Sequence, residues 1–281
     1  MQSKYIRPKY SKQHSRKNHM KYPKKNLGQN FLTSEGAIYR AIEASSLKQG
    51  VRVLEIGPGH GALTRALLEK GAQVVAIEKD SCLVEELSHS FASYIEQKAL
   101  TLINADATTI SYTEVCPFPY IIVANIPYNI TGTILRHIFS QSTLPERVVL
   151  IVQKEVGERI AREKKESVLS LSIKAYGTPR YLTTIKAGSF YPKPRVDSAL
   201  ITITNISKTH FASPNEERLF FSLIKNGFAQ KRKILKRRLV ETGMVEKDLL
   251  DHAYLTCTIN EKARAEDLSL THWLCLLKQI S

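Results

Sequence analysis

Cysteine is scarce in this sequence, and the few cysteines stand far apart. Four occur in 281 residues, namely Cys82, Cys116, Cys257 and Cys275. They include no Cys-x-x-Cys pair, and no histidine stands at a metal-ligand spacing from them, so neither a disulfide framework nor a zinc site is predicted. We therefore expect reduced thiols, as in a cytosolic protein, and no metal centre.

Long hydrophobic runs are also missing. No apolar stretch reaches the roughly 20 residues that a membrane-spanning helix needs. No apolar segment follows the positively charged N-terminus, as one would in a secretory signal. Pro8 and Pro23 interrupt this Lys-rich stretch, which argues against the amphipathic helix of a mitochondrial transit peptide. We therefore predict a cytoplasmic protein without a membrane partner.

Acidic residues are absent from two stretches that hold much of the positive charge. The chain has 41 Lys and Arg against 26 Asp and Glu, for a formal net charge of +15. Residues 1–25 carry nine of these basic residues and residues 218–240 carry eight. The remainder is nearly neutral, so this pattern favours a polyanion partner, nucleic acid first. A solvated face kept for solubility is the alternative, and an anionic membrane is disfavoured because no apolar face accompanies residues 1–25.

The order of apolar segments predicts an α/β fold followed by a helical domain. Strand and helix patterns alternate between residues 51 and 152, as in the parallel βαβ units of a doubly wound, Rossmann-like sheet. A strand pair at 181–185 and 198–204, around a Pro-rich turn, is expected to end the sheet. The predicted strands are 51–56, 73–77, 100–103, 120–124 and 148–152, and the predicted helices are 62–69, a helix capped by Asp80 that runs through 92, and 131–139. The predicted units are a basic flexible arm (1–25), an α/β domain (26–206) and a small all-helical domain (207–281).

A glycine-rich loop follows the first predicted strand. Glu55-Ile56-Gly57-Pro58-Gly59-His60-Gly61 ends this strand and opens a helix, where an α/β sheet binds nucleotide-like ligands. Gly57 and Gly59 allow a close approach of the backbone to the ligand. Glu78 ends the second strand about 20 residues later, as expected of a carboxylate that accepts hydrogen bonds from ribose hydroxyls.

Three features favour S-adenosylmethionine over a nicotinamide dinucleotide in this loop. The spacing is G-x-G-x-G, not G-x-G-x-x-G. Glu55 would repel a pyrophosphate, whereas it attracts the cationic methionine end of S-adenosylmethionine. Asp106, followed by Ala107, ends the third strand, where a carboxylate can bind an adenine amino group. A tight turn that binds no ligand is the alternative.

The sequence Asn125-Ile126-Pro127-Tyr128 closes the fourth strand, and its residue types suit chemistry on an adenine amine. The N6 amine is a weak nucleophile because its lone pair is delocalised into the ring. The Asn125 side-chain oxygen and the Ile126 carbonyl can accept both amine hydrogens and hold the nitrogen in line with the methyl sulfonium. The Tyr128 ring can stack on the base, which would be flipped out of any duplex. A simple turn with Tyr128 in the core is the alternative.

Phe190 stands just before a Pro-rich sequence, residues 191–198. This rigid loop could bring a second aromatic ring over the other face of the adenine. A proline-bounded turn with Phe190 in the core is an equally open interpretation.

Together these motifs resemble the KsgA family of ribosomal RNA adenine dimethyltransferases, relatives of the erythromycin-resistance methylases and the mitochondrial transcription-factor B proteins. The resemblance runs from about Lys25 to the C-terminus. It adds Gly28-Gln29-Asn30-Phe31-Leu32 as an opening cofactor motif and Phe190 to Ser198 as a substrate loop. The cofactor-binding residues then expected are Gln29, Asn30, Leu32, Glu55, Gly57, Gly59, Glu78, Asp106, Ala107 and Asn125, and the expected catalytic residues are Asn125, Ile126, Pro127, Tyr128 and Phe190.

The resemblance implies S-adenosylmethionine-dependent N6 dimethylation of two adjacent adenosines near the 3′ end of small-subunit (16S) ribosomal RNA, in an assembling subunit. We expect a monomer. The RNA backbone would be bound by Lys231, Arg232, Lys233, Lys236, Arg237 and Arg238. Two features depart from the family pattern, since Ile126 replaces the usual Leu and the basic arm is longer than usual. The alternatives are a methylase of large-subunit RNA, a non-catalytic assembly or transcription factor, and a nicotinamide oxidoreductase, which would need a catalytic His, Tyr-Lys or Cys arrangement that is missing here.

Overall fold

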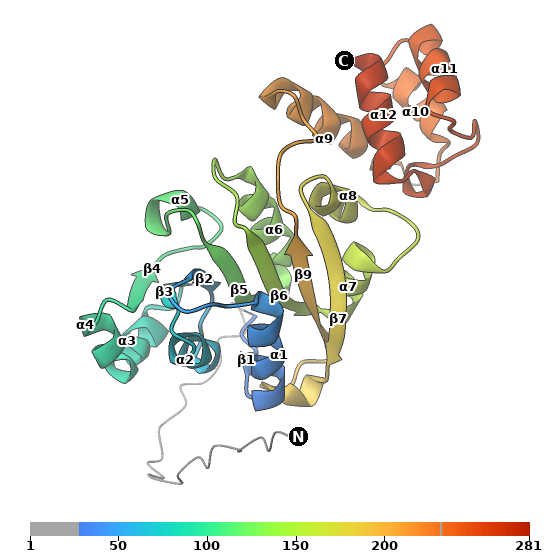
Figure 1. Cartoon of the computed structure of the whole chain (residues 1–281). Helices are drawn as coiled ribbons and strands as arrows, with labels where there is room; N and C mark the ends of the chain where they lie inside the picture. The colour runs from blue at the N-terminus through green and yellow to red at the C-terminus, as the bar shows by residue number, and fades with distance from the viewer. Residues whose placement is uncertain (1–27, 231) are drawn as a thin grey trace, which may run out of the picture.

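The computed structural model describes residues 28–230 and 232–281 (Figure 1). The predicted basic arm over residues 1–25 and the predicted RNA contact Lys231 lie outside the described residues. None of the helices in the described ranges is both long and apolar enough to cross a membrane.

A seven-stranded sheet in the order β4-β3-β2-β5-β6-β9-β7 forms the centre of the larger part of the molecule. The strands are β2 (Arg52–Ile56), β3 (Gln73–Glu78), β4 (Leu100–Asn104), β5 (Ile121–Asn125), β6 (Arg147–Gln153), β7 (Thr178–Ile185) and β9 (Ser198–Thr204). The first five are parallel, and β9 pairs antiparallel with both β6 and β7. The prediction of a doubly wound sheet that ends in an antiparallel strand pair is confirmed, although β7 begins earlier than predicted.

Helices cover both faces of this sheet. They are α1 (Glu35–Ser45), α2 (Ala62–Glu69), α3 (Ser81–Ser90), α4 (Ala92–Glu96), α5 (Tyr112–Val115), α6 (Thr131–Ser140), α7 (Lys154–Ala161) and α8 (Val168–Lys174). Asp80 caps α3 through a hydrogen bond from Cys82 N, as predicted, but the helix ends at Ser90 and α4 follows. Helices α1, α5, α7 and α8 were not predicted.

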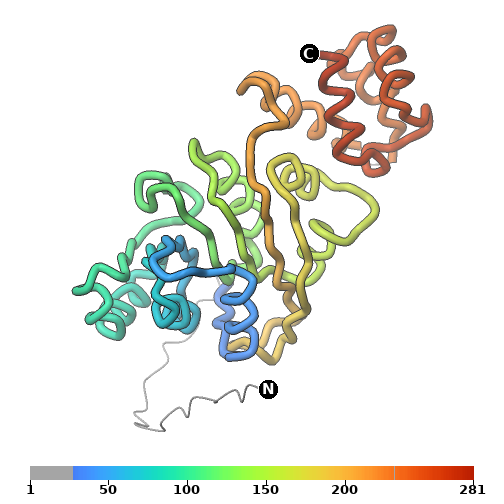
Figure 2. The backbone as a smooth tube through the Cα atoms, viewed as in Figure 1, coloured from blue at the N-terminus to red at the C-terminus, as the bar shows by residue number. Residues whose placement is uncertain are grey.

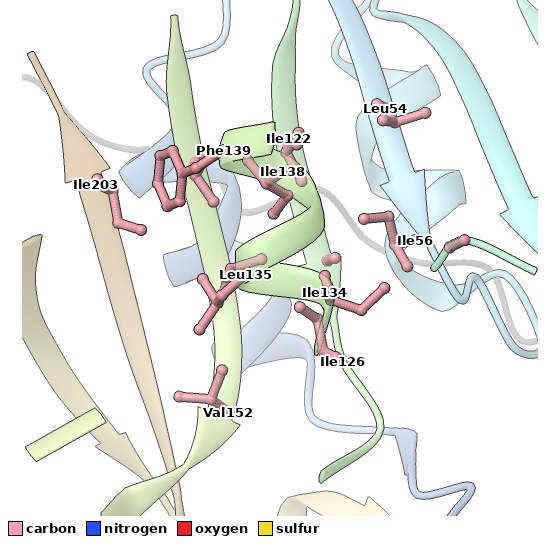
Figure 3. Packing of buried hydrophobic residues seen from close by; sticks show 14 of the residues in the cluster. Leu54, Ile56, Ile122, Ile126, Ile134, Leu135, Ile138, Phe139, Val152 and Ile203 are labelled. Atoms are coloured by element: carbon pink, nitrogen blue, oxygen red, sulfur yellow. The ribbon is translucent and has the colours of Figure 1, made fainter. Parts of the chain in front are cut away.

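Alternating side chains of each strand enter two separate hydrophobic cores. Leu54 and Ile56 belong to the core under α5–α8, whereas Val53 belongs to the core under α1–α3. This alternation is the period of two that a strand imposes on its side chains. Figure 3 shows the first core, where Ile138 and Phe139 of α6 lie close to strand residues that include Ile122.

Helices α9 (Pro214–Phe228), α10 (Leu235–Glu241), α11 (Lys247–Thr256) and α12 (Leu270–Ile280) follow the last strand of the sheet. The chain leaves β9 and enters these helices beyond one end of the sheet (Figure 2). Their core surrounds the fully buried Trp273 and includes Leu171 of α8 and Ala175, which directly follows α8. The helical unit therefore packs on the α/β part through α8, and the division at residue 206 stays a prediction.

Cys257 and Cys275 form a disulfide, so the expectation of reduced thiols is wrong for this pair. Cys257 follows α11 and Cys275 lies in α12, and the packing of the two helices brings their Cα atoms to 5.8 Å. A separation of 18 residues does not by itself predict a disulfide, because the pairing depends on how the two helices pack. Cys82 and Cys116 are free thiols.

Gly157 provides a test of the packing between α7 and β9. A Cβ at this position would meet the Ala199 Cβ at 2.6 Å, whereas a Cβ at Gly132 of α6 would meet nothing within 4 Å. We expect Gly157→Ala to lower the free energy of unfolding by about 1–3 kcal/mol through overpacking. Gly132→Ala should raise it by up to about 1 kcal/mol through helix propensity. Urea denaturation followed by circular dichroism measures both, and equal stabilisation by the two substitutions would contradict the close packing of α7.

Candidate active site

A pocket lies at the carboxyl ends of β2, β3 and β5, at the place where the strand order reverses. Strands β2 and β5 are direct neighbours there, although they are far apart in the chain. Open α/β sheets bind their ligands at this position, because the loops that follow the two strands diverge and leave a crevice. The pocket is lined by the predicted residues Gln29, Asn30, Leu32, Glu55, Gly57, Gly59, Glu78, Asp106, Ala107, Asn125, Ile126, Pro127 and Tyr128.

The segment that opens the described chain closes one side of this pocket. Strand β1 (Phe31–Leu32) pairs antiparallel with β8 (Phe190–Tyr191). The Phe31 ring lies so close to the glycine loop that a Cβ on Gly59 would meet its Cδ1 at 2.8 Å. Gly59 has a φ of +59°, which together with this contact leaves room only for glycine.

Asn125 is held by a hydrogen bond to the opening segment. Its Nδ2 donates to the Asn30 carbonyl oxygen at 2.9 Å. The donor side of the amide is thereby engaged, so the Oδ1 side is available as an acceptor. The next side chain, Ile126, is buried in the core and anchors the main chain at the end of β5. This arrangement leaves the two predicted acceptors, Asn125 Oδ1 and the Ile126 carbonyl, next to each other in sequence at the pocket.

Glu55 is a buried carboxyl group beside the glycine loop. It is 1% exposed, and its Oε2 has no hydrogen-bond partner within the described ranges. Burial raises the pKa of Glu55 to about 8, an effect that the nearby Thr64 hydroxyl partly offsets and the Glu78 carboxylate increases. Glu55 is therefore largely protonated at neutral pH, because no basic group in the described part of the chain lowers its pKa.

Glu78 joins the glycine loop to the end of β3. Its Oε2 accepts a hydrogen bond from Gly59 N at 3.2 Å, and its Oε1 accepts one from Asp80 N at 2.9 Å. Burial raises the pKa of Glu78, while these backbone donors lower it. The two bonds fix the carboxyl group in the pocket wall.

Asp106 is the ionised acid of the site. Lys79 Nζ lies 2.8 Å from its Oδ2, and Thr108 donates to its Oδ1 from both the backbone and the hydroxyl. The Lys79 hydrogen bond, followed by those from Thr108, lowers the pKa of Asp106 to about 2. Asp106 is thus a permanent hydrogen-bond acceptor at neutral pH.

The two predicted aromatic residues have different places. Tyr128 is half-buried, lines the pocket and has its hydroxyl 2.6 Å from Ser198 Oγ. Phe190 is 4% exposed, packs in the core under α1–α3 and does not line the pocket. The core interpretation of Phe190 is therefore the correct one for this conformation, because the pairing of β8 with β1 turns its side chain inward.

Part of the basic stretch is engaged in ion pairs within the helical unit. Lys236 Nζ lies 2.7 Å from Asp251 Oδ1 and 2.7 Å from Glu261 Oε2. Lys233 Nζ lies 3.2 Å from Glu241 Oε2. Lys236, with 19% of its side chain exposed, connects α10 to α11 and to the loop before α12.

The other predicted RNA contacts differ in exposure. Arg232 and Arg237 are exposed and have no carboxylate partner in the described part of the chain. Arg238 is half-buried, with a buried Nε. Among the predicted RNA contacts that the structure describes, Arg232 and Arg237 are therefore the cations most available to a polyanion.

Several pocket residues were missed by sequence reasoning, among them His60, Lys79 and Asn129. His60 Nδ1 lies 2.7 Å from Glu86 Oε1, and its ring lies against Phe31 with the centroids 4.3 Å apart. His60 is part of the predicted glycine-rich loop, but no role was assigned to it. Its contacts with Glu86 of α3 and Phe31 of β1 depend on how those elements pack against the loop. Lys79 could have been found from the pairing of β3 with β4, which brings it beside Asp106.

Residues 20–281 match the sequence model of the family described as "Ribosomal RNA adenine dimethylase". The protein named ribosomal RNA small subunit methyltransferase A from Dehalococcoides mccartyi (strain CBDB1) is 37% identical over 258 residues, which cover 90% of this chain and 87% of that one. Its namesake from Fusobacterium nucleatum subsp. nucleatum is 36% identical over 258 residues, covering 91% and 96% of the two chains.

Two solved structures share the fold over most of their length. The 23S rRNA methyltransferase ErmE is similar with a TM-score of 0.72 at 23% identity, covering 89% of this chain and 99% of its own. A dimethyladenosine transferase from Plasmodium falciparum is similar with a TM-score of 0.71 at 25% identity, covering 88% and 95%.

The raised pKa of Glu55 predicts a specific pH dependence of stability. The pKa of Glu55 is about 8 in the folded protein, against an ordinary value of 4.5. Between these values the folded chain binds one more proton than the unfolded chain, so the free energy of unfolding falls as pH rises. Glu55→Gln removes this loss, and above pH 8 the variant should be more stable than the wild type, by on the order of a few kcal/mol.

Urea denaturation of the ligand-free protein across this pH range measures the effect. Asp106→Asn is the matched control, since Asp106 has a pKa of about 2 and is ionised throughout this range. Parallel stability curves for the wild type and Glu55→Gln would show that Glu55 is already ionised in the fold.

Proposed function

This chain belongs to the ribosomal RNA adenine dimethylase family, and we propose that it dimethylates the N6 amine of adenosines in small-subunit ribosomal RNA with S-adenosylmethionine as the methyl donor. The proposal extends to two adjacent adenosines near the 3′ end of that RNA, modified in the cytoplasm by a monomer. The observation that carries it is Asn125, whose amide is oriented by the Asn30 carbonyl directly beside the glycine loop.

The residues of the pocket fit S-adenosylmethionine. The buried Glu55 has a free oxygen that would gain a partner from a cationic group, and Asp106 is an ionised acceptor. A Cβ on Gly57 would meet nothing nearer than 3.9 Å, so the loop backbone is open on this side. In this proposal the Glu55 carboxylate attracts the cationic methionine end of the cofactor. The Glu78 carboxylate accepts hydrogen bonds from the ribose hydroxyls, and the Asp106 carboxylate accepts one from the adenine amine of the cofactor. When bound, the cofactor supplies an electrophilic methyl carbon.

The acceptors at the end of β5 prepare the target amine for attack. Asn125 Oδ1 and the Ile126 carbonyl accept its two hydrogens, hold the nitrogen in line for transfer and stabilise the charge that develops on it. The half-buried Tyr128 ring stacks on the target base and keeps it flipped out of the RNA duplex. No strong base is required, because the alkylated nitrogen is acidic and releases its proton to water at Asn125.

The helical unit supplies the binding energy for the RNA in this proposal. Arg232 and Arg237 contact phosphates, whereas Lys236 serves the fold through its ion pairs with Asp251 and Glu261. This division separates RNA contacts from structural cations within a single basic stretch.

The central prediction concerns Asn125. We expect the wild type to transfer labelled methyl groups to unmethylated small ribosomal subunits, with dimethyladenosine detected by nucleoside analysis. Asn125→Ala should lower kcat by about 100-fold or more, because one of two acceptors for the developing charge is lost. Asn226→Ala removes a half-buried asparagine of α9 outside the pocket and should retain wild-type activity. When unmethylated large subunits are supplied in a parallel reaction, label found only in large-subunit RNA would contradict the proposed substrate.

A second prediction separates the two kinds of basic residue. Arg237→Gln should weaken binding to small-subunit RNA and reduce the slope of log K against log salt by about one, as expected for the loss of one phosphate contact. Lys236→Gln should lower the unfolding midpoint, since Asp251 and Glu261 lose their partner, while the salt slope changes little. Filter-binding titrations at several salt concentrations measure the slopes, and an equal loss of slope in both variants would mean that Lys236 also contacts phosphate.

A further inference from the structure

A single hydrogen bond connects the proposed stacking ring to the centre of the sheet. The hydroxyl oxygens of Tyr128 and Ser198 lie 2.6 Å apart. Ser198 is fully buried, which is unusual for a serine, and its hydroxyl has this one partner within the described ranges. A buried polar group is normally retained for the hydrogen bond that it makes, so the contact with Tyr128 accounts for a serine at this position.

Ser198 is a fixed anchor. It is the first residue of β9, where it pairs with Gln153 of β6 on one side and with Ile185 of β7 on the other. The preceding residue, Asp197, accepts hydrogen bonds from Lys154 N at 3.0 Å and from Ala187 N at 2.9 Å. Strand pairing on both sides and these two bonds leave the Ser198 hydroxyl little freedom to move.

Tyr128 has fewer constraints of its own. It begins a short 3-10 turn, η2 (Tyr128–Ile130), and its side chain is half-buried at the pocket. A ring held only at its Cβ can change rotamer, whereas a hydrogen bond between its tip and a rigid partner selects one orientation. Burial raises the pKa of Tyr128, so the phenol stays neutral and the contact is a bond between two neutral hydroxyls.

We propose that Ser198 is a positioning residue for methyl transfer, whose hydroxyl holds the Tyr128 ring in the orientation that stacks on the target base. This inference rests on the proposed function. Ser198 is the last residue of the Pro-rich sequence 191–198, so the bond also ties that loop to the segment Asn125-Ile126-Pro127-Tyr128. The bond thereby fixes the Tyr128 ring before the target base binds. Loss of the bond should lower kcat and leave the affinity for the cofactor nearly unchanged.

A double-mutant cycle tests whether Ser198 acts through Tyr128. The proteins are the wild type, Ser198→Ala, Tyr128→Phe and the double variant, and the measurements are kcat on small subunits and the Kd for S-adenosylmethionine by calorimetry. Each single substitution should lower kcat by about three- to tenfold, the size expected for one neutral hydrogen bond, with the Kd unchanged. The double variant should be no slower than the single variants, because both remove the same bond.

Ser45→Ala is a matched control for the loss of a buried hydroxyl. Ser45 is 2% exposed and donates to the Ile42 carbonyl at 2.6 Å within α1, away from the pocket. It should lower the unfolding midpoint and leave kcat at the wild-type value. Wild-type kcat in Ser198→Ala, or single losses that multiply in the double variant, would overturn the proposal.

A structural measurement separates this inference from the proposed function. Crystal structures of the wild type and Ser198→Ala, without substrate, should show one Tyr128 rotamer in the first and a second or disordered rotamer in the second. A single unchanged rotamer in Ser198→Ala would overturn the positioning role, whatever the substrate. Absence of methyl transfer by the wild type, with the rotamer change present, would instead overturn the proposed function and leave the positioning of Tyr128 in place.

Discussion

The parallel pairing of β2 with β5 is the constraint on which the site depends. Both strands end at the same edge of the sheet, so the glycine loop after β2 and the Asn125 segment after β5 become neighbours. Because the strand order reverses between them, the connections that follow the two strands diverge and leave a crevice at their carboxyl ends. The opening segment then closes this space, through the bond from Asn125 to Asn30 and the contact of Phe31 with Gly59.

Different surroundings give two acids of this pocket, Glu55 and Asp106, different charge states. Glu55 is buried, has no basic group of the described residues beside it and is largely neutral at pH 7, whereas Asp106 lies next to Lys79 and is ionised. A ligand that brings positive charge to Glu55 would remove the cost of ionising a buried carboxyl group, so binding and ionisation are coupled there. The same logic applies to the basic stretch, where the exposed Arg237 has no carboxylate partner among the described residues while Lys236 is neutralised by two.

Much of the fold and of the cofactor site was predictable because the relevant signals are local. The short apolar run that contains Val53, Leu54 and Ile56 identifies a buried strand, and the cap at Asp80 marks the start of a helix, within a few residues of sequence. The motifs at strand ends were predictable for the same reason, since the carboxyl edge of a parallel sheet gathers them without knowledge of the side-chain packing. Helix α1 was missed, although Ser34 caps it, because its apolar pattern is weak beside those of the strands.

The sequence by itself determined the doubly wound sheet, the cofactor loop and the Asn125 segment, since each follows from periodicity and turn chemistry over short stretches. Only the tertiary structure decided which side chains meet across elements. The pairing of β8 with β1 buried Phe190, and the packing of two helices joined Cys257 to Cys275. The tertiary structure also placed the Ser198 hydroxyl within hydrogen-bond distance of the Tyr128 hydroxyl. These contacts join residues that are far apart in the chain, and their partners are selected by packing, which local sequence patterns do not encode.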